Sequence, residues 1–302
     1  MLNWVREKFH PLWYLRRRSA AFRWITRNIR IKVGLRIKDI DHKVYVDLLR
    51  NPYMIGSPDK YERQDLDLMI YLISRLKLRR MFDVGANLGI YSFSFSANAQ
   101  QGQVVAFEPD NINARLFDKT NARCPRRDIA LVRKAVSETS GTATFLLDDM
   151  AGATGTLRQD GATFSERNYG GAALRATVET TTIDDASKRH FPPDFIKIDV
   201  EGAELDVLKG ARQTLKVARP IMLIEIGSEE ALRAVQEFLG EIDYVLRPIT
   251  RPNYIAGHRD AELWSQMDQH AINIAQPRTE PGARALAIGA AGTEARQDAR
   301  VG

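Results

Sequence analysis

The chain has 302 residues, of which 44% are hydrophobic and 27% are charged, enough for one hydrophobic core of ordinary domain size. Cys124 is its single cysteine, which excludes an intrachain disulfide and a cysteine-based metal cluster. No stretch approaches the ~18 consecutive apolar residues of a membrane-spanning helix. Together with the lone cysteine, this predicts a cytoplasmic protein.

The net charge of +6 is concentrated near the N-terminus, where residues 1–38 carry eleven basic side chains and a single acidic one. Phe22, Ile25 and Ile29 fall on one helical face opposite arginines, a pattern typical of a helix that lies in a membrane interface. An amphipathic helix packed on its own domain explains the pattern equally well. Nucleic-acid binding is a weaker interpretation, because no base-reading module follows. We predict a separate segment, residues 1–40, with possible contact to the inner face of the membrane.

From residue 42 onward, apolar periodicity predicts regular secondary structure. A strand over 42–48 precedes a helix over 57–78. The predicted strands that follow span 80–85, 103–109, 129–137, 142–149, 194–202, 220–227, 243–249 and 271–277. The predicted helices between them span 90–99, 111–123, 203–216 and 228–242. Such alternation predicts an α/β fold, in which helices cover both faces of a parallel sheet.

Two stretches lack this periodicity. The segment from Asp148 to Thr177 is rich in glycine and longer than an ordinary loop, which indicates a functional loop. Within it, Arg158, Arg167 or Arg175 could contact an acidic sugar or a phosphate. Residues 278–302 are predicted to be a disordered tail, so the folded domain is expected over residues 41–277.

One motif suggests a ligand at the end of a strand. The stretch MFDVGANLGIYS runs an apolar strand into Asp83 and turns through Gly85 and Gly89 before a helix. Ligands of open parallel sheets bind beyond the carboxyl ends of the strands. A dinucleotide fingerprint starting at Gly85 would need glycines where this chain has Asn87 and Ile90. A pyrophosphate is therefore disfavoured at this turn.

A ligand with a ribose and no phosphate suits the turn better, and S-adenosylmethionine (SAM) is such a ligand. Asp83 can accept a hydrogen bond from its ammonium, and the N–H groups of the turn, at a helix N-terminus, suit its carboxylate. Glu108 closes the next predicted strand and has two oxygens for two ribose hydroxyls. In the alternative interpretation, Asp83 caps a turn and Glu108 is a surface acid.

Several blocks of the sequence resemble the FkbM family of SAM-dependent methyltransferases in order and spacing. They are FDVGANLGIYS, VVAFEPDNINARLFDKTNA, KAVSETSGTATF, TTIDD, DFIKIDVEGAELDVLKGA and PIMLIEIG, and the resemblance covers residues 61–277. It implies a class I methyltransferase (Rossmann-like) fold, whose seven-stranded, mostly parallel sheet has its last strand antiparallel. It also implies O-methylation of a hydroxyl, often that of a sugar in a polysaccharide or glycolipid.

The resemblance also implies the residues that bind SAM. It places the methionine end against Asp83, Gly85, Asn87 and Gly89. It assigns Glu108 to the ribose, and the stretch 134–137, with Ala135 and Val136, to the surroundings of the adenine.

Three acids are candidates for the chemical step. Asp199 ends the strand of FIKIDVEG, Glu201 follows it, and Glu225 ends the next strand. A carboxylate at this edge can accept the proton that a hydroxyl loses as it attacks a methyl group. The three acids could also hold a divalent cation, but no spacing supports this and a metal-free site is favoured. Alternatively, Asp199 is a helix N-cap and Glu201 and Glu204 favour the helix dipole.

Two further functions compete with the methyltransferase. One is an NAD-dependent oxidoreductase, disfavoured by Asn87 and Ile90. The other is a catalytically silent methyltransferase-like module that binds a membrane or a protein through its basic segment. The presence of Asp83, Glu108 and Asp199 argues against a silent module. The expected partner is a small-molecule or glycan acceptor, with no nucleic acid.

Overall fold

A computed structural model describes residues 19, 21–22, 24–25, 29–51, 54, 58–60, 62–126, 128–147, 152, 154–158 and 174–268. The chain divides into two compact units, Met1–Leu263 and Trp264–Gly302. All the strands described below belong to the first unit. In the second, the structure describes residues 264–268, which are helical. The strand predicted over 271–277 and the predicted tail lie outside the described residues.

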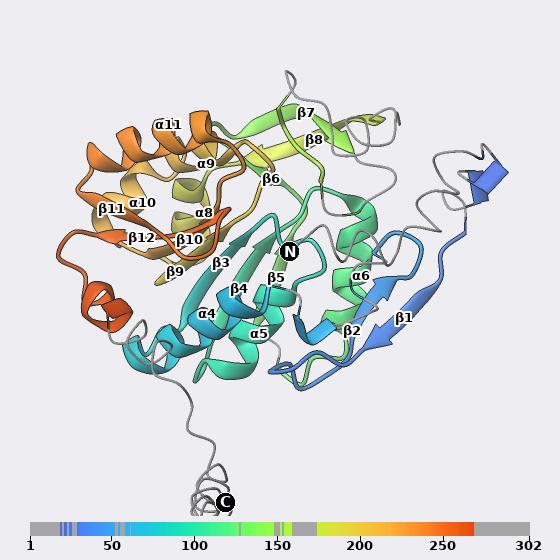
Figure 1. Ribbon diagram of the computed structural model, residues 1–302. Helices are drawn as coiled ribbons and strands as arrows, with labels where there is room; N and C mark the ends of the chain where they lie inside the picture. The colour runs from blue at the N-terminus through green and yellow to red at the C-terminus, as the bar shows by residue number, and fades with distance from the viewer. Residues whose placement is uncertain are drawn as a thin grey trace, which may run out of the picture. The chain divides into compact units, whose positions relative to one another are not determined.

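The first unit is built on a seven-stranded sheet with the strand order β11-β12-β10-β9-β3-β4-β5 (Figure 1). Its strands are β3 (Arg80–Val84), β4 (Gln103–Phe107), β5 (Ile129–Val132), β9 (Phe195–Ile198), β10 (Ile221–Glu225), β11 (Tyr244–Pro248) and β12 (Asn253–His258). β12 runs antiparallel to both β10 and β11, and the other neighbouring pairs of these seven strands are parallel. The predicted fold class, a mostly parallel sheet with its last strand antiparallel, is confirmed.

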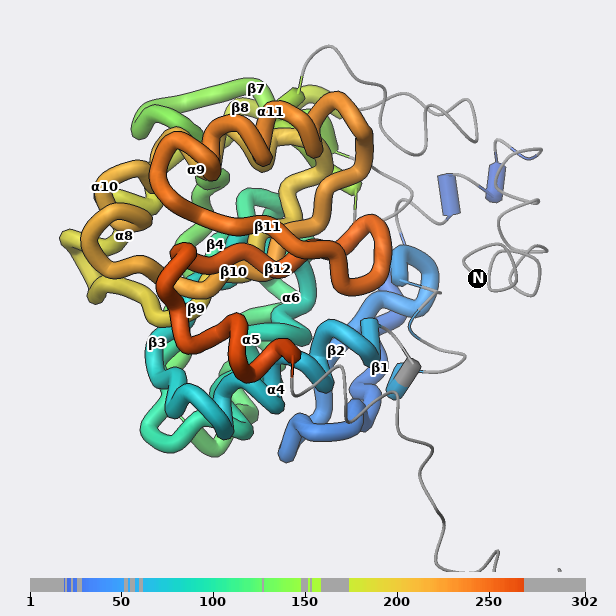
Figure 2. Tube along the Cα trace, turned by 60° about the vertical axis from the view of Figure 1, so that its left-hand side comes forward, coloured from blue at the N-terminus to red at the C-terminus, as the bar shows by residue number. Residues whose placement is uncertain are grey.

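Helices cover both faces of this sheet (Figures 1 and 2). One face carries α4 (Arg63–Leu76), α5 (Ile90–Asn98) and α6 (Asn111–Asn121), and the other carries α8 (Ile183–Arg189), α9 (Glu204–Lys209), α10 (Arg212–Val217) and α11 (Glu229–Gly240). Phe82, Ile196 and Ile198 are fully buried in the core that includes residues of α8–α11. Side chains alternate along a strand, so Asp83 and Lys197 face the opposite side, toward α4 and α5.

Two small sheets accompany the main one. β1 (Lys32–Leu35) pairs antiparallel with β2 (Val44–Asp47). The second sheet has the order β6-β8-β7, from β6 (Ala135–Val136), β7 (Gly141–Leu147) and β8 (Leu174–Thr181). A 3-10 turn, η2 (Pro58–Lys60), precedes α4.

Several predicted boundaries were wrong. The helix predicted over 203–216 is two helices, α9 and α10, and the strand predicted over 129–137 is β5 and β6 in different sheets. Strand β8 begins inside the segment predicted to be a loop. Strand β12 was not predicted, because its sequence NYIAGH has no clear alternation and contains a glycine. Its pairing with β10 and β11 is made by the backbone.

The N-terminal segment is described only in part. Trp24 is 66% exposed, and Ile25 and Ile29 are also exposed. Ile29 N donates to Ile25 O over 2.8 Å, so these two isoleucines lie one helical turn apart. Residues 32–35 of the predicted separate segment form β1 and pair with β2. Among the described residues, no helix has the length and apolar character needed to cross a membrane.

The C-terminal end of β3 and the residue that follows it lie against the end of β9. Asp199 N donates to Val84 O over 3.0 Å. Gly85 has a φ of +78°, and a Cβ added there would lie 1.8 Å from the carbonyl oxygen of Asp199. This position therefore requires glycine for two reasons, its left-handed backbone and the approach of the Asp199 carbonyl.

We expect Gly85→Ala to lower the free energy of unfolding by more than about 2 kcal/mol, since a left-handed backbone alone costs an alanine roughly 1–2 kcal/mol and the clash adds to this. Denaturant unfolding measures the difference. Gly227→Ala is the matched control, because an added Cβ there has no atom within 4 Å. Equal stabilities of the two variants would contradict this constraint.

Candidate active site

Four neighbouring strands end at one edge of the main sheet in a common register. The last paired row contains Val84, Phe107, Ile198 and Ile224. The residues that follow this row are Gly85, Glu108, Asp199 and Glu225. The register thus brings together three of the acids that the sequence singled out, at the carboxyl edge of the parallel strands.

Glu108 holds the turn that follows β3. Its Oε2 accepts from Asn87 N over 2.8 Å, and its Oε1 accepts from Asp110 N over 2.8 Å. The residue is only 5% exposed, so the interpretation of Glu108 as a surface acid is wrong. Burial, reinforced by the charge of Asp110, raises the pKa of Glu108 to about 8.

Most backbone N–H groups in the turn of residues 85–89 already donate hydrogen bonds within the protein. Gly85 N and Ala86 N both donate to Phe107 O, and Gly89 N donates to Ala86 O. With Asn87 N on Glu108, four of the five N–H groups are engaged within the protein. A ligand carboxylate therefore finds fewer donors in this turn than the sequence suggested. Gly89 is required for packing, because an added Cβ would meet the Phe93 and Phe117 rings within 2.7 Å.

Asp83 lies below this turn and is 1% exposed. Its Oδ2 accepts from Ser92 N over 3.0 Å and from Ser92 Oγ over 2.5 Å. Burial raises the pKa of Asp83 to about 6. Asp83 thus fastens the first turn of α5 to β3, which is the capping role that the sequence left as an alternative. Its contact with a ligand stays a prediction.

Ala135 and Val136 form β6, and both side chains are buried, at 5% and 2% exposure. The strand pairs with β8 in the small sheet. The side chains are thus directed into the protein, and their predicted proximity to adenine stays a prediction.

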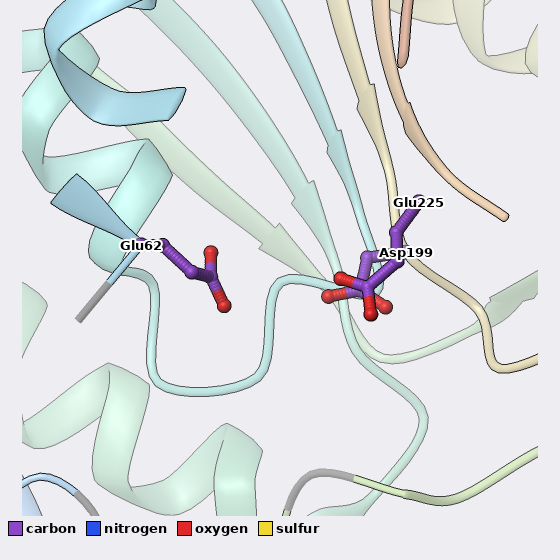
Figure 3. A group of neighbouring side chains, drawn as sticks. All are labelled: Glu62, Asp199 and Glu225. Atoms are coloured by element: carbon purple, nitrogen blue, oxygen red, sulfur yellow. The ribbon is translucent and has the colours of Figure 1, made fainter. Parts of the chain in front are cut away.

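Three carboxylates from different elements lie close together at the carboxyl edge of the parallel strands. We call them the acidic cluster: Glu62, Asp199 and Glu225. One oxygen of each lies within 4.8 Å of those of the other two. Figure 3 shows the Asp199 and Glu225 carboxylates side by side, with Glu62 directed toward them. Asp199, together with burial, holds the pKa of Glu225 well above its usual range.

Glu201 is not a member of the acidic cluster, although the sequence grouped it with Asp199 and Glu225. It is exposed and has a left-handed backbone, with a φ of 53°. Helix α9 begins at Glu204 and its N-cap is Ala203. The alternative in which Asp199 caps this helix is therefore wrong. Glu204 does accept from Gly202 N over 2.7 Å, as expected of an acid at a helix start.

Sequence reasoning missed two residues near this edge. Glu62 precedes α4 at its N-cap position with a φ of 46°, and it reaches the acidic cluster only through the packing of α4. Arg50 is 2% exposed and forms a buried ion pair with Asp110, beside Glu108. Neither residue lies in a recognisable motif, and both are distant in sequence from their partners.

The acidic cluster has the oxygen chemistry of a divalent cation site, with Glu62 in place of Glu201. It also has a cation of its own. Lys197 Nζ lies 3.8 Å from Asp199 Oδ2, and the lysine side chain is 2% exposed. The protein itself thus supplies positive charge next to these carboxylates, so their convergence alone does not require a metal ion.

The strand order and the acids beyond the carboxyl ends define an α/β protein of the class I methyltransferase type. The chain belongs to the FkbM methyltransferase family, because the family model described as "Methyltransferase FkbM domain" matches residues 83–248, more than half of the chain. This match confirms the resemblance seen in the sequence blocks.

Similar proteins carry methyltransferase names. The chain is 26% identical over 155 residues to "Methyltransferase sdnD" of Sordaria araneosa, a match that covers 42% of this chain and 58% of that protein. It is 29% identical over 163 residues to "Hexuronic acid methyltransferase AglP" of Haloferax volcanii, covering 53% and 61%. For "2-O-methyltransferase NoeI" of Sinorhizobium fredii the identity is 28% over 184 residues, covering 55% and 72%.

The chain thus spans about 60% of the length of the first two of these relatives. Among solved structures, the methyltransferase FkbM from Methylobacillus flagellatus KT is similar with 20% identity and a TM-score of 0.44. That match covers 60% of this chain and 44% of the other.

The pKa of Glu108 predicts how stability changes with pH. An acid with a higher pKa in the folded than in the unfolded chain binds its proton more tightly when folded, so stability falls as pH rises between the two values. For Glu108 these are about 4.5 and about 8. We expect the unfolding free energy of Glu108→Gln to fall less than that of the wild type between about pH 5 and about pH 8. Denaturant titrations at several pH values measure these free energies. If the free energies of the two proteins change equally with pH, the prediction is contradicted.

Proposed function

We propose that the protein is a SAM-dependent O-methyltransferase that acts on a hydroxyl of a sugar in a polysaccharide or glycolipid precursor. The observation that carries this proposal is the common register in which Glu108, Asp199 and Glu225 follow the strands beside the Gly85 turn. Membership of the FkbM family supports it.

The residues present fit SAM. Asn87 Oδ1 is a buried acceptor without a hydrogen-bond partner among the described residues, on the residue whose N–H binds Glu108. Each Glu108 oxygen accepts one backbone hydrogen bond and retains a lone pair. We assign Asn87 and Glu108 to the cofactor, with Glu108 on the ribose hydroxyls. SAM supplies an electrophilic methyl group on a sulfonium.

Asp199 is the group that we assign to the acceptor. With SAM bound, the acceptor oxygen would take the methyl group and leave S-adenosylhomocysteine, and an Asp199 oxygen would accept the hydroxyl proton. Asp199 is 28% exposed, so its carboxylate is accessible to a hydroxyl. Alignment of the acceptor oxygen supplies much of the acceleration, and the carboxylate contributes general-base assistance.

The sugar acceptor is supported by the names of two relatives, a hexuronic acid methyltransferase and a 2-O-methyltransferase. Arg158 lies beside Gly202, three residues after Asp199, since a Cβ on Gly202 would be 2.8 Å from Arg158 Cδ. Its guanidinium suits an acidic group of the acceptor. Arg167 lies outside the described residues, and Arg175 is an exposed residue of β8.

The rival functions are distinguished by one set of titrations. An oxidoreductase binds NAD, whereas the proposed enzyme binds SAM and S-adenosylhomocysteine. A silent module transfers no methyl group. Calorimetry with the three ligands, followed by labelled SAM offered with candidate glycans, separates these functions. Tight NAD binding without SAM binding would overturn the proposal.

We expect Asp199→Asn to bind S-adenosylhomocysteine like the wild type and to transfer methyl groups about 10²–10⁴-fold more slowly, the usual value of general-base assistance. The substitution keeps the shape of the side chain and removes its charge. Asp260→Asn is the matched control, because Asp260 is 80% exposed in its pair with His258. Near-full turnover of Asp199→Asn would exclude Asp199 as the base and direct attention to Glu225 or Glu62.

We also propose peripheral contact of the N-terminal segment with anionic membranes. Trp24, Ile25 and Ile29 are exposed apolar side chains in a segment rich in arginine. Such a combination favours an interface between water and lipid.

Removal of residues 1–28 leaves β1 and β2 intact and tests this contact. We expect the truncated protein to sediment less with anionic vesicles than the full chain does, while S-adenosylhomocysteine affinity stays unchanged. Added salt should weaken the contact, because it screens surface charges. Trp24→Ala separates insertion of the apolar face from charge attraction. If the full chain fails to sediment with vesicles at low salt, the proposed contact is excluded.

A further inference from the structure

Lys197 is a buried ammonium that the family motif and the proposed reaction leave unexplained. It lies one residue before the end of β9, two residues from Asp199, so both side chains project from the same face of the sheet. Its side chain is 2% exposed, and its Nζ is 3.8 Å from Asp199 Oδ2. Among the described residues, no atom accepts a hydrogen bond from this Nζ.

Titratable groups from several packed elements surround this ammonium. Those facing it are Glu62, Asp65, Asp83, Tyr91, Asp199 and Glu225. Burial lowers the pKa of Lys197, but the attraction of Asp199 and the other carboxylates outweighs it and the net shift is upward. Lys197 is therefore a stable cation within an excess of acids.

A purely structural role explains this arrangement poorly. Removal of an ammonium from water costs several kcal/mol even after relaxation, and an apolar side chain of similar size would pack between β9 and α5 without that cost. The contact with the Tyr91 ring, 5.2 Å from Nζ to the centroid, offsets only part of it. The 3.8 Å approach to Asp199 is the one direct ion pair that Lys197 makes among the described residues.

The two acids next to this ion pair differ in their environments. Asp199 is the one paired with Lys197. Glu225, which has Asp199 as its neighbour, has a pKa well above the usual range. The ammonium thus lies within ion-pair distance of Asp199, and among the described residues no such pair joins it to Glu225.

We propose that Lys197 is a positioning residue for methyl transfer, whose ammonium holds the Asp199 carboxylate by charge attraction and directs it to the acceptor hydroxyl. This inference rests on the proposed function. Lys197 keeps its own protons throughout, and the proton of the acceptor goes to Asp199.

Lys197→Met tests the proposal through the pH dependence of kcat/KM. Without the cation, the Asp199 carboxylate is protonated more readily. As the pH is lowered, activity is therefore lost at a higher pH than in the wild type. We expect the acid limb to move upward by at least about one pH unit, the scale of one neighbouring charge, while S-adenosylhomocysteine affinity stays within about threefold of the wild type. Lys209→Met is the matched control, because Lys209 forms an exposed ion pair with Glu138 at 3.6 Å. An unmoved acid limb in Lys197→Met would overturn the proposal.

A double substitution separates action through Asp199 from other roles. If Lys197 acts through Asp199, Lys197→Met adds no further loss of kcat to Asp199→Asn. If the kcat losses of the two single variants multiply in the double variant, the proposal is contradicted. Should Lys197→Met fail to fold, Lys197→Arg keeps the charge and should retain the acid limb of the wild type. A shift as large as a full pH unit in Lys197→Arg would likewise overturn it.

Two further measurements keep this proposal distinct from its rivals. A crystal structure of Lys197→Met should show the Asp199 carboxylate displaced from its wild-type position, because its ion-pair partner is gone. This readout needs no acceptor, and it holds even if no hydroxyl is methylated and the proposed function fails. An Asp199 carboxylate that keeps its wild-type position contradicts the proposal. Wild-type activity should survive dialysis against EDTA, whereas loss that Mg²⁺ restores would assign the acidic cluster to a metal ion instead.

Discussion

The approach of Gly85 to the carbonyl oxygen of Asp199 is the contact on which the candidate active site depends. A Cβ at position 85 would lie 1.8 Å from that oxygen, so the turn after β3 and the end of β9 lie this close only because residue 85 is glycine. The same turn is held from the other side by Glu108, through Asn87 N. One short segment therefore determines both where a cofactor would bind and where Asp199 stands.

The alternation of side chains along the central strands separates the core from the site chemistry. Ile196 and Ile198 pack into the core with α8–α11, whereas Lys197 and Asp199 face α4 and α5. The polar face is costly to bury, and only some of its polar atoms are paired within the described residues. Asn253 Nδ2 donates to Asp65 Oδ2 over 2.7 Å, which ties β12 to α4 beside the acidic cluster. The antiparallel strand thus contributes to the site as well as to the sheet.

Much of this arrangement could be predicted from the sequence, because the strands FIKI and IMLIE are largely apolar, and Asp199 follows the first while Glu225 ends the second. The parallel order then brings those ends to one edge. Glu62 could not be predicted, because its place depends on how α4 packs over the sheet. Strand β12 was missed for a related reason, since its backbone pairing leaves little trace in the sequence. Lys197 was visible in the motif, but its burial became apparent only from the fold.

A crystal structure with S-adenosylhomocysteine decides whether the turn after β3, Glu108 and Asp199 form one SAM site. We expect the ribose hydroxyls on Glu108, the homocysteine portion along the turn of residues 85–89, and the sulfur facing Asp199. A nucleoside bound elsewhere on the chain, or bound at this edge with Glu108 making no contact to the ribose, would contradict it.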